Sequence, residues 1–183
     1  MSDMICISET WLNPDEQLSD LQLDVYSLHV NSAGPGKGLA TYFKDTEFKP
    51  EVDINENECQ LSKFTSRNID VVSVYRSSGC RIKFEDIFKN ITLLNEKPTL
   101  IVGDMNICYQ EQRENGNIQY LETNRFKQIV TGPTHLQGGH IDHVYLNDYQ
   151  SQFKSVDVEM YSPYYTCRDH DGLLTTLIPS RKR

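Results

Sequence analysis

The segment LIVGDMN, from Leu100 to Asn106, most constrains the fold of this chain. A short apolar run ends at Gly103, and an acid and an amide follow, which predicts a buried strand that ends in a polar turn. Asp104 and Asn106 would project to the same side, because side chains alternate along an extended segment. A carboxylate there can hold a metal or orient a water. Asp and Asn are also ordinary turn residues, so the segment alone leaves both interpretations open.

The length of 183 residues fits a single domain, residues 1–183, with one sizeable core. An apolar content of 38% and a charged content of 24% favour a folded domain over disorder. No run approaches the roughly 20 apolar residues of a membrane span, and no secretory signal is seen, so we expect no membrane partner. The five scattered cysteines include no CxxC pair, which disfavours a disulfide framework or zinc knuckle and favours a reducing compartment.

The net charge of −8 argues against a protein that wraps nucleic acid non-specifically, because neutralising phosphates requires Lys and Arg. The negative net charge does not exclude an enzyme that binds one phosphate through a metal ion. Residues 180–183 form a small basic tail, which suits either a nuclear address or a solvated chain end. We expect an intracellular, nuclear localisation.

Segments rich in β-branched and aromatic residues recur along the chain and predict strands. They are Asp3–Ile7, Gly38–Phe43, Ile69–Tyr75, Thr99–Val102, Ile141–Leu146 and Leu173–Ile178. Helices are predicted at Phe84–Leu94, from its apolar spacing, and at Thr123–Val130, whereas the polar residues 107–122 predict a loop. The GPGKG run at Gly34–Gly38 lacks the Walker spacing and predicts a hairpin turn. Mixed elements in which strands outnumber helices predict an α/β or α+β sandwich.

Polar residues stand at the ends of several predicted strands. Glu9 follows the first strand, and Trp11, the only tryptophan, comes two residues later, where packing is its simplest role. Tyr75 and Arg76 close another strand, where a phenol can donate to a phosphate oxygen and a guanidinium can pair with one. Taken singly, each of these residues is more often an ordinary surface or packing residue.

A histidine-rich segment leads into the strand that begins near Asp142. Three histidines crowd near this one acid, but their spacing matches no standard zinc pattern. Asp142 suits a carboxylate that orients another side chain, and His143 would face the opposite way in an extended strand.

The pair Asp169-His170 precedes the last predicted strand. His170 is a candidate general acid or phosphate contact, and an acid partner would hold its imidazole in one tautomer. A solvated polar turn is the alternative for this pair alone. The joint order of these polar groups along successive strands carries more weight than any one of them.

The motifs SETWL, VYR, GDMN and GPTH, in this order, resemble the endonuclease/exonuclease/phosphatase superfamily, which includes DNase I, exonuclease III and apurinic endonucleases. In particular they resemble the apurinic-type endonuclease domain of non-LTR retrotransposons, and the likeness runs from Asp3 to about Ile178. The resemblance implies a DNase I-like, four-layer α/β sandwich, in which two packed mixed β-sheets are flanked by helices. It also implies metal-assisted hydrolysis of a phosphodiester.

The resemblance assigns roles by motif. Glu9 matches a magnesium-binding glutamate, and Asp169 matches an acid close to the metal, so Mg²⁺ or Mn²⁺ is the implied cofactor. Asp104 matches the acid that aligns or deprotonates the attacking water, and Asp142 matches the partner of a catalytic histidine, here His170. The side chains expected to contact the substrate are Tyr75, Arg76, Asn106, Thr134 and Arg168. Of these, Tyr75 and Asn106 are also expected to be catalytic.

The sequence departs from the family pattern in three places, one of which is Gly138-Gly139-His140 in place of a more usual Ser-containing approach to Ile141-Asp142. The family normally begins with a strand that carries an Asn and with a helix, whereas this chain starts at the strand before Glu9, so we expect no counterpart of that strand, helix or metal-site Asn. Arg168 stands where the family usually has Ser.

Three functions are compatible with these residues. The first is a magnesium-dependent DNA endonuclease of retrotransposon type that nicks one strand, with DNA as partner and a larger polyprotein or reverse transcriptase as a further one. The second is a catalytically weakened or inactive remnant that acts in binding or assembly. The third is a phosphoesterase that acts on RNA or an inositol lipid.

Overall fold

A computed structural model gives the structure of the chain. It describes residues 2–12, 18–32, 34–56, 58–89, 91, 97–147, 152–161 and 169–180. The strands are β1 (Met4–Ser8), β2 (Ser27–Asn31), β3 (Leu39–Phe43), β4 (Lys49–Glu56), β5 (Cys59–Thr65), β6 (Asp70–Arg76), β7 (Thr99–Asp104), β8 (Lys127–Gln128), β9 (Asp142–Asn147), β10 (Phe153–Tyr161) and β11 (Gly172–Pro179). The helices are η1 (Leu18–Leu21, a 3₁₀ turn), α1 (Phe84–Phe88) and α2 (Gly116–Thr123).

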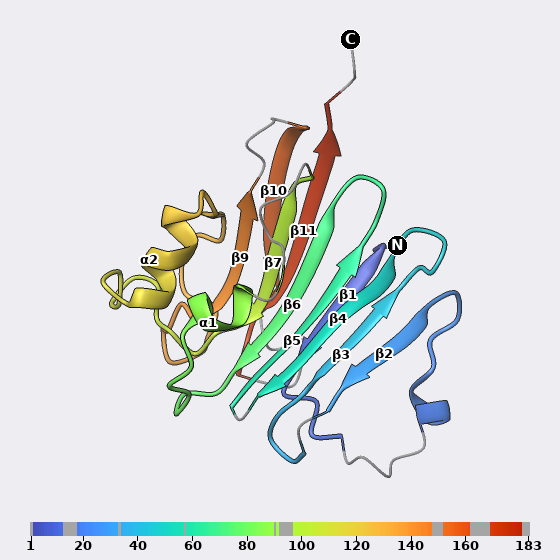
Figure 1. The fold of residues 1–183 in the computed structure, drawn as a ribbon, viewed down its shortest axis with the longest axis horizontal. Helices are drawn as coiled ribbons and strands as arrows, with labels where there is room; N and C mark the ends of the chain where they lie inside the picture. The colour runs from blue at the N-terminus through green and yellow to red at the C-terminus, as the bar shows by residue number, and fades with distance from the viewer. Residues whose placement is uncertain are drawn as a thin grey trace.

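The largest sheet has six strands in the order β4-β5-β6-β7-β9-β8 (Figure 1). Only β6 and β7 run parallel in it, and the other neighbours are antiparallel. A three-stranded sheet, β1-β3-β2, and the hairpin-like pair β10-β11 are also antiparallel. The mixture of strand directions fits a sandwich of sheets rather than a regular βαβ repeat.

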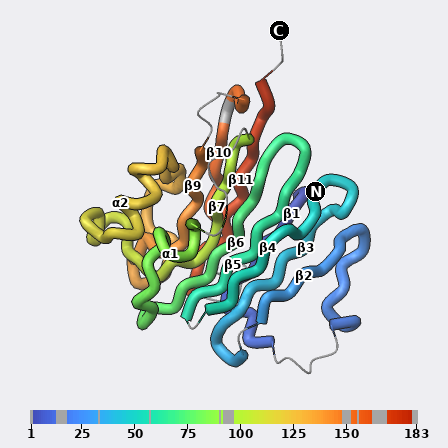
Figure 2. Tube along the Cα trace, in the orientation of Figure 1, coloured from blue at the N-terminus to red at the C-terminus, as the bar shows by residue number. Residues whose placement is uncertain are grey.

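One face of the six-stranded sheet packs against the two α-helices. Val72 of β6 and Ile101 of β7 belong to one apolar cluster with Phe84 of α1 and Leu121 of α2. All four side chains are almost fully buried, and each such burial stabilises the fold by about 1.5–3 kcal/mol relative to exposure. Figure 2 traces α1 and α2 side by side on the flank of the molecule away from β2, and the two helices contact each other.

The other face of the six-stranded sheet packs against the smaller sheets. Val71 and Leu100, which neighbour Val72 and Ile101 in sequence, point into a second cluster with Phe43 of β3. Leu173 of β11 packs against the same cluster, so both smaller sheets lie over this face. The alternation of side chains along the strands thus separates two cores, and the predicted α/β sandwich is confirmed.

All six predicted strands are present, each displaced by no more than about two residues at an end. The predicted turn at Gly34–Gly38 lies in the connection between β2 and β3, which pair in register with Asn31 opposite Leu39. Strands β2, β4, β5, β8 and β10 were not anticipated. β4 is largely exposed and charged, and β5 buries polar residues such as Lys63, which pairs with Asp70 at 3.3 Å, so neither shows a simple apolar pattern.

The helix predicted at Thr123–Val130 is wrong. α2 ends at Thr123, Arg125 adopts a left-handed φ of 66°, and β8 follows. The loop predicted for residues 107–122 is correspondingly wrong over its last part. Asn115 caps α2 by accepting a hydrogen bond from the Asn117 N–H at 2.9 Å, and two inward-facing apolar residues anchor the helix in the core.

The helix predicted at Phe84–Leu94 begins where expected. α1 spans Phe84–Phe88, and Ile91 beyond it is also buried in the core, whereas residues 92–96 lie outside the described residues. Among the helices of the described residues, none is long and apolar enough to cross a membrane.

Candidate functional site

Three polar residues line up across neighbouring strands at one end of the six-stranded sheet. Tyr75 of β6 lies opposite Asp104 of β7, and Asp104 lies opposite Asp142 of β9. Residues directly opposite each other project from the same face of a sheet. This face is the one that packs against the smaller sheets, so the row lies at the end of the sandwich, between its layers.

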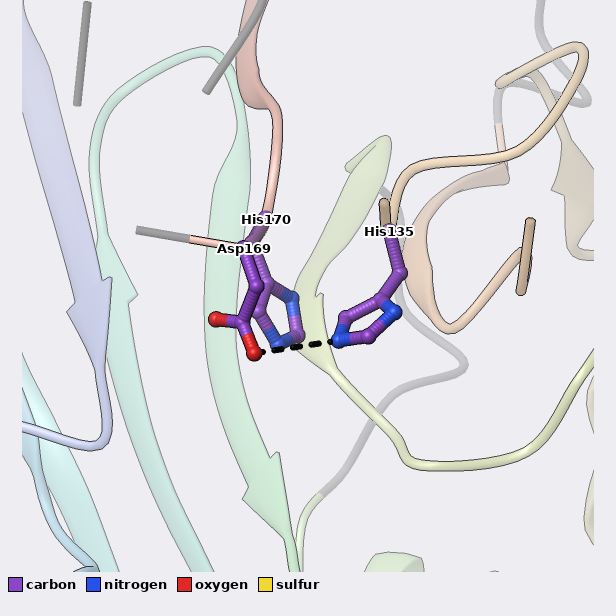
Figure 3. Close-up of side chains that lie close together, drawn as sticks. All are labelled: His135, Asp169 and His170. Carbon is purple, nitrogen blue, oxygen red and sulfur yellow. Dashed lines mark hydrogen bonds and ion pairs between the residues drawn. The ribbon is translucent and has the colours of Figure 1, made fainter. Parts of the chain in front are cut away.

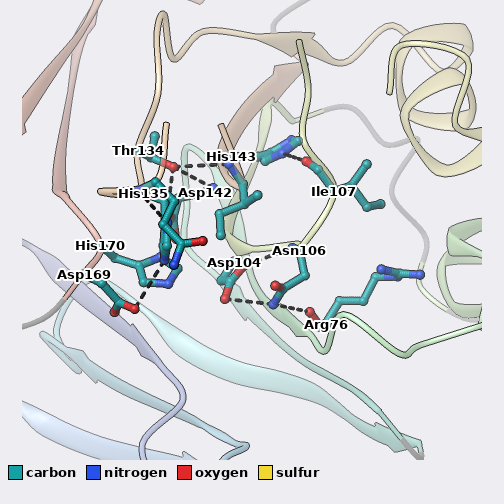
Figure 4. Close-up of polar contacts among 12 residues, drawn as sticks. Arg76, Asp104, Asn106, Ile107, Thr134, His135, Asp142, His143, Asp169 and His170 are labelled. Carbon is teal, nitrogen blue, oxygen red and sulfur yellow. Dashed lines mark hydrogen bonds and ion pairs between the residues drawn. The ribbon is translucent and has the colours of Figure 1, made fainter. Parts of the chain in front are cut away.

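Asp142 holds two side chains in place (Figure 4). Its Oδ2 atom accepts a hydrogen bond from the Thr134 hydroxyl at 2.7 Å and lies 2.9 Å from Nδ1 of His170. The Thr134 Oγ1 atom in turn accepts the backbone N–H of Asp142 at 3.0 Å. Because Nδ1 of His170 faces a carboxylate, that nitrogen carries a proton and the imidazole is fixed in orientation.

Asp104 is held by Asn106. The two carboxylate oxygens accept hydrogen bonds from the Asn106 backbone N–H at 2.9 Å and from its side-chain Nδ2 at 3.1 Å. Nδ2 also donates to the Arg76 carbonyl at 2.9 Å, so both hydrogens of this amide are engaged. Asn106 has a left-handed φ of 48°, which bends the chain back toward Asp104. The Asn106 amide would therefore donate to a phosphate only by giving up its bond to Asp104 or its bond to the Arg76 carbonyl.

Glu9 approaches the row from the neighbouring sheet, just beyond β1. Its Oε1 atom accepts a hydrogen bond from the Tyr75 hydroxyl at 2.7 Å, and the same hydroxyl lies 3.2 Å from the carbonyl oxygen of Gly36. Burial, together with Glu9, raises the pKa of Tyr75, so its hydroxyl stays protonated and acts as a donor. Tyr75 thus orients Glu9.

A second cluster joins the segment before β9 to the segment before β11 (Figure 3). His135 and His170 form an isolated antiparallel bridge, and their rings meet edge to face with centroids 4.8 Å apart. Nε2 of His135 lies 3.3 Å from Oδ2 of Asp169. The Gln137 N–H donates to Nδ1 of His135 at 3.1 Å, so the neutral ring carries its proton on Nε2 and donates it to Asp169.

The acids of the row repel one another. Burial, followed by the charge of Asp142, raises the pKa of Asp104 to about 7. The hydrogen bond to Asp142 raises the pKa of His170 to about 9. At neutral pH the site therefore holds a cationic imidazole beside a carboxyl group that titrates near neutrality, an arrangement suited to proton transfer.

The structure brings most of the predicted site residues together. Potential metal-ligand atoms form two groups, and within each group they lie within 4.8 Å of one another. One group consists of Asp104, Asp142 and His170, and the other of His135, Asp169 and His170. His135 was not among the predicted site residues, because its approach to Asp169 depends on a pairing between distant segments that no local pattern shows.

Two predicted substrate contacts are corrected. Thr134 is 0% exposed and its hydroxyl is committed to Asp142, so it supports that carboxylate and cannot reach a substrate directly. Arg76 is 7% exposed and, next to Tyr75 in β6, points to the opposite, helical face, where its guanidinium donates to the carbonyls of Met105 and Cys80. Arg168 lies outside the described residues.

His143 faces away from the row, as the alternation of β9 predicts. It is fully buried, and its Nε2 lies 2.8 Å from the Ile107 carbonyl oxygen. Burial lowers the pKa of His143 to about 4, so the ring is neutral and structural.

The donors of the site fit a hard divalent cation. Glu9 lies close enough to Asp104 for its charge to contribute to the raised pKa of that carboxyl group, and Asp142 adds to the same effect. Carboxylate oxygens are the ligands that Mg²⁺ and Mn²⁺ prefer, and such a cation would relieve this excess of negative charge.

The sequence matches the model of the "Endonuclease/Exonuclease/phosphatase family" over residues 1–165. The chain belongs to this family. Its members are hydrolytic nucleases and phosphatases that generally depend on a divalent metal. A search of curated proteins returns no match.

Solved structures share the fold. An AP endonuclease from Archaeoglobus fulgidus superposes with a TM-score of 0.69 at 14% identity, covering 96% of this chain and 88% of that one. A 3′ phosphatase from Neisseria bound to a product DNA hairpin gives 0.69 at 13% identity, with 96% and 88% covered. The endonuclease domain of TRAS1, a telomere-specific non-LTR retrotransposon, gives 0.61 at 13% identity, with 86% and 80% covered. These likenesses establish the DNase I-like fold of the chain.

Proposed function

We propose that this family member is a metal-dependent DNA endonuclease of retrotransposon type, which nicks one strand through attack of an activated water. The observation that carries the proposal is the register of Tyr75, Asp104 and Asp142 across three strands, with His170 bonded to Asp142. The row joins a carboxyl group that titrates near neutral pH to a histidine that stays protonated. Retrotransposon and DNA-bound neighbours support the choice of DNA.

Asp104 is the proposed base. With both oxygens oriented by Asn106, it would accept one proton from a water whose oxygen attacks the phosphorus. The new P–O bond forms as the P–O3′ bond breaks, and the 3′ oxygen that leaves takes a proton from solvent water, which gives a 5′ phosphate and a free 3′ hydroxyl. A positioned base of this kind contributes about 10²–10⁴-fold to the rate.

His170 is the proposed phosphate contact. Asp142 keeps Nδ1 protonated and the imidazolium in place, so its positive charge would act on a phosphoryl oxygen bound beside the ring. A cationic donor held in place offsets the negative charge that builds on the phosphorus oxygens during attack.

Glu9 and Asp169 are the proposed metal ligands, each oriented by a donor, Tyr75 for Glu9 and His135 for Asp169. A bound Mg²⁺ or Mn²⁺ would supply charge stabilisation to the phosphate oxygens. Hydrogen bonds to metal-binding carboxylates commonly fix their orientation in this way.

Relaxation of supercoiled plasmid by the purified chain tests the proposal. We expect nicked circles in Mg²⁺, none in EDTA, and none with Asp104→Ala or His170→Ala. Asp86→Asn, a change at an exposed acid of α1, is the matched control and should nick normally. Equal nicking by wild type and both site variants would refute the residue assignments.

Two other functions can be distinguished from a DNA endonuclease by hydrolysis assays on further substrates. A binding or assembly role would be indicated by a folded chain that hydrolyses no phosphate ester in Mg²⁺ or Mn²⁺. A panel that compares DNA, RNA and phosphoinositides would reveal a phosphoesterase of different substrate class.

A further inference from the structure

Trp11 lies beside the candidate site, and the proposed hydrolysis does not use it. It is the only tryptophan of the sequence, and 57% of its surface is exposed. The packing role expected from the sequence is therefore only partly fulfilled. The indole rests against Gly36, where its Cη2 and Cζ2 atoms lie 3.5 Å from the position that a Cβ would occupy.

The backbone that presents this indole is strained. Glu9 and Trp11, just beyond the end of β1, both have left-handed φ angles, 53° and 56°. This conformation is unfavourable for bulky side chains, and such outliers gather at functional sites, where surrounding contacts impose them. The same strained segment thus carries a candidate metal ligand and an exposed aromatic ring.

The indole and the candidate metal ligand share one support. Gly36, which contacts the indole, also has its carbonyl oxygen 3.2 Å from the Tyr75 hydroxyl. That hydroxyl donates a hydrogen bond to Glu9 at 2.7 Å. The indole is therefore separated from Tyr75, the first residue of the row, by a single residue. A nucleotide whose phosphate lies at that row would bring a neighbouring base within reach of the ring.

The charge of the chain favours such a contact. With a net charge of −8, the protein gains little from neutralising DNA phosphates along its surface. Stacking of a base on an aromatic ring adds affinity without a cation, and it tolerates any sequence because every base has a π face.

We propose that Trp11 is a base-stacking site for a nucleotide next to the scissile phosphate of a DNA strand. The choice of DNA rests on the proposed function. Gly36 supports one side of the indole, and the exposed part of the ring receives the base. The site would thus discriminate a nucleic acid from a phosphate ester that lacks bases.

The fluorescence of the single tryptophan tests the proposal directly. The full chain is titrated with the oligonucleotide dT12 and with an abasic 12-mer of the same charge, with wild type in EDTA and Asp104→Asn in Mg²⁺ to prevent hydrolysis. We expect dT12 to quench the emission and the abasic strand to leave it nearly unchanged. Equal responses to both strands would overturn the proposal, because only the bases differ.

Affinity provides the second measurement. By anisotropy of labelled dT12, Trp11→Ala should raise Kd about 5- to 150-fold, the range of one lost base stack, and Trp11→Phe should recover most of the affinity. The ratio of the two Kd values should be the same at low and high salt, because stacking releases no counterions. Val25→Ala, at another exposed apolar residue with a left-handed φ of 67°, is the matched control and should bind as wild type.

The outcomes separate this proposal from the proposed function. Quenching by bases without plasmid nicking would refute the endonuclease and leave the stacking site in place. If the wild-type chain nicks plasmid and Trp11→Ala binds dT12 as tightly as wild type, the stacking site is refuted and the endonuclease remains. Emission that changes with protein concentration but not with dT12 would assign Trp11 to self-association and overturn the proposal.

Discussion

Asp104 and Asp142 face each other directly across β7 and β9, and their negative charges repel each other. The fold tolerates two facing acids because each has its own donors, Asn106 for one and Thr134 with His170 for the other. Burial, together with the charge of Asp142, raises the pKa of Asp104, and the hydrogen bond to Asp142 raises the pKa of His170. These two shifts are the basis of the chemistry proposed for the site.

Asp104→Asn should lower the nicking rate by about 10²–10⁴-fold, since the amide cannot accept a proton. Its melting temperature above pH 7 should be equal to or higher than that of wild type, because the change removes a buried charge facing Asp142. Nicking rate and thermal melting of the same preparation check both. Loss of activity together with a lower melting temperature would indicate misfolding instead of a lost base.

The pH dependence of nicking should follow the two facing groups. The rate rises as Asp104 loses its proton around pH 7 and falls as His170 loses its proton around pH 9. More Mg²⁺ should move the acid limb to lower pH, because a cation stabilises the carboxylate. In Asp142→Asn both limbs should move to lower pH, since Asp142 raises both pKa values, and limbs that stay in place would contradict the pairing.

His135→Ala should raise the Mg²⁺ concentration needed for half-maximal nicking about 10–100-fold, because Asp169 loses the donor that orients it. His135→Gln, which keeps an N–H donor, should recover much of the affinity. Metal titrations of the nicking rate provide the measurement. An unchanged Mg²⁺ requirement in both variants would remove His135 from the site.

Gly103→Ala should destabilise the fold by on the order of 3 kcal/mol. Gly103 has a φ of 144°, and a Cβ there would overlap the carbonyl oxygen of Val74 on the adjacent strand. Gly116→Ala is the control, because a Cβ at that helical position meets nothing within 4 Å. Urea unfolding of the two variants should differ clearly, with the helical one equal to or more stable than wild type.

The fold should lose about 3 kcal/mol of stability between pH 6.5 and 4 through His143 alone. Its pKa falls from 6.5 to about 4 on folding, so the unfolded chain binds the proton first as the pH drops. Burial also lowers the pKa of His140, so this residue destabilises the fold in acid in the same way. Urea unfolding across this range tests the effect, and His143→Gln, which keeps a donor for the Ile107 carbonyl, should flatten the curve.

The sequence alone determined the strands whose apolar or β-branched residues alternate, including the one that ends in Asp104. It also placed an acid, an amide or a histidine at the end of several strands, and the order of these motifs indicated the family. Local pattern was sufficient here because strand propensity and turn chemistry act within a few residues. It failed for α2, where only a cap and two inward-facing apolar residues mark a helix in a polar stretch.

The tertiary structure decided what each polar residue contacts. Register across β6, β7 and β9 aligned Tyr75, Asp104 and Asp142, and strand alternation turned Arg76 to the helical face. The bridge between His135 and His170 depends on chain segments that are far apart in sequence. LIVGDMN therefore predicted that an acid follows a buried strand, but only the tertiary structure, which buries Asp104 and places it opposite Asp142, raised the pKa of that carboxyl group.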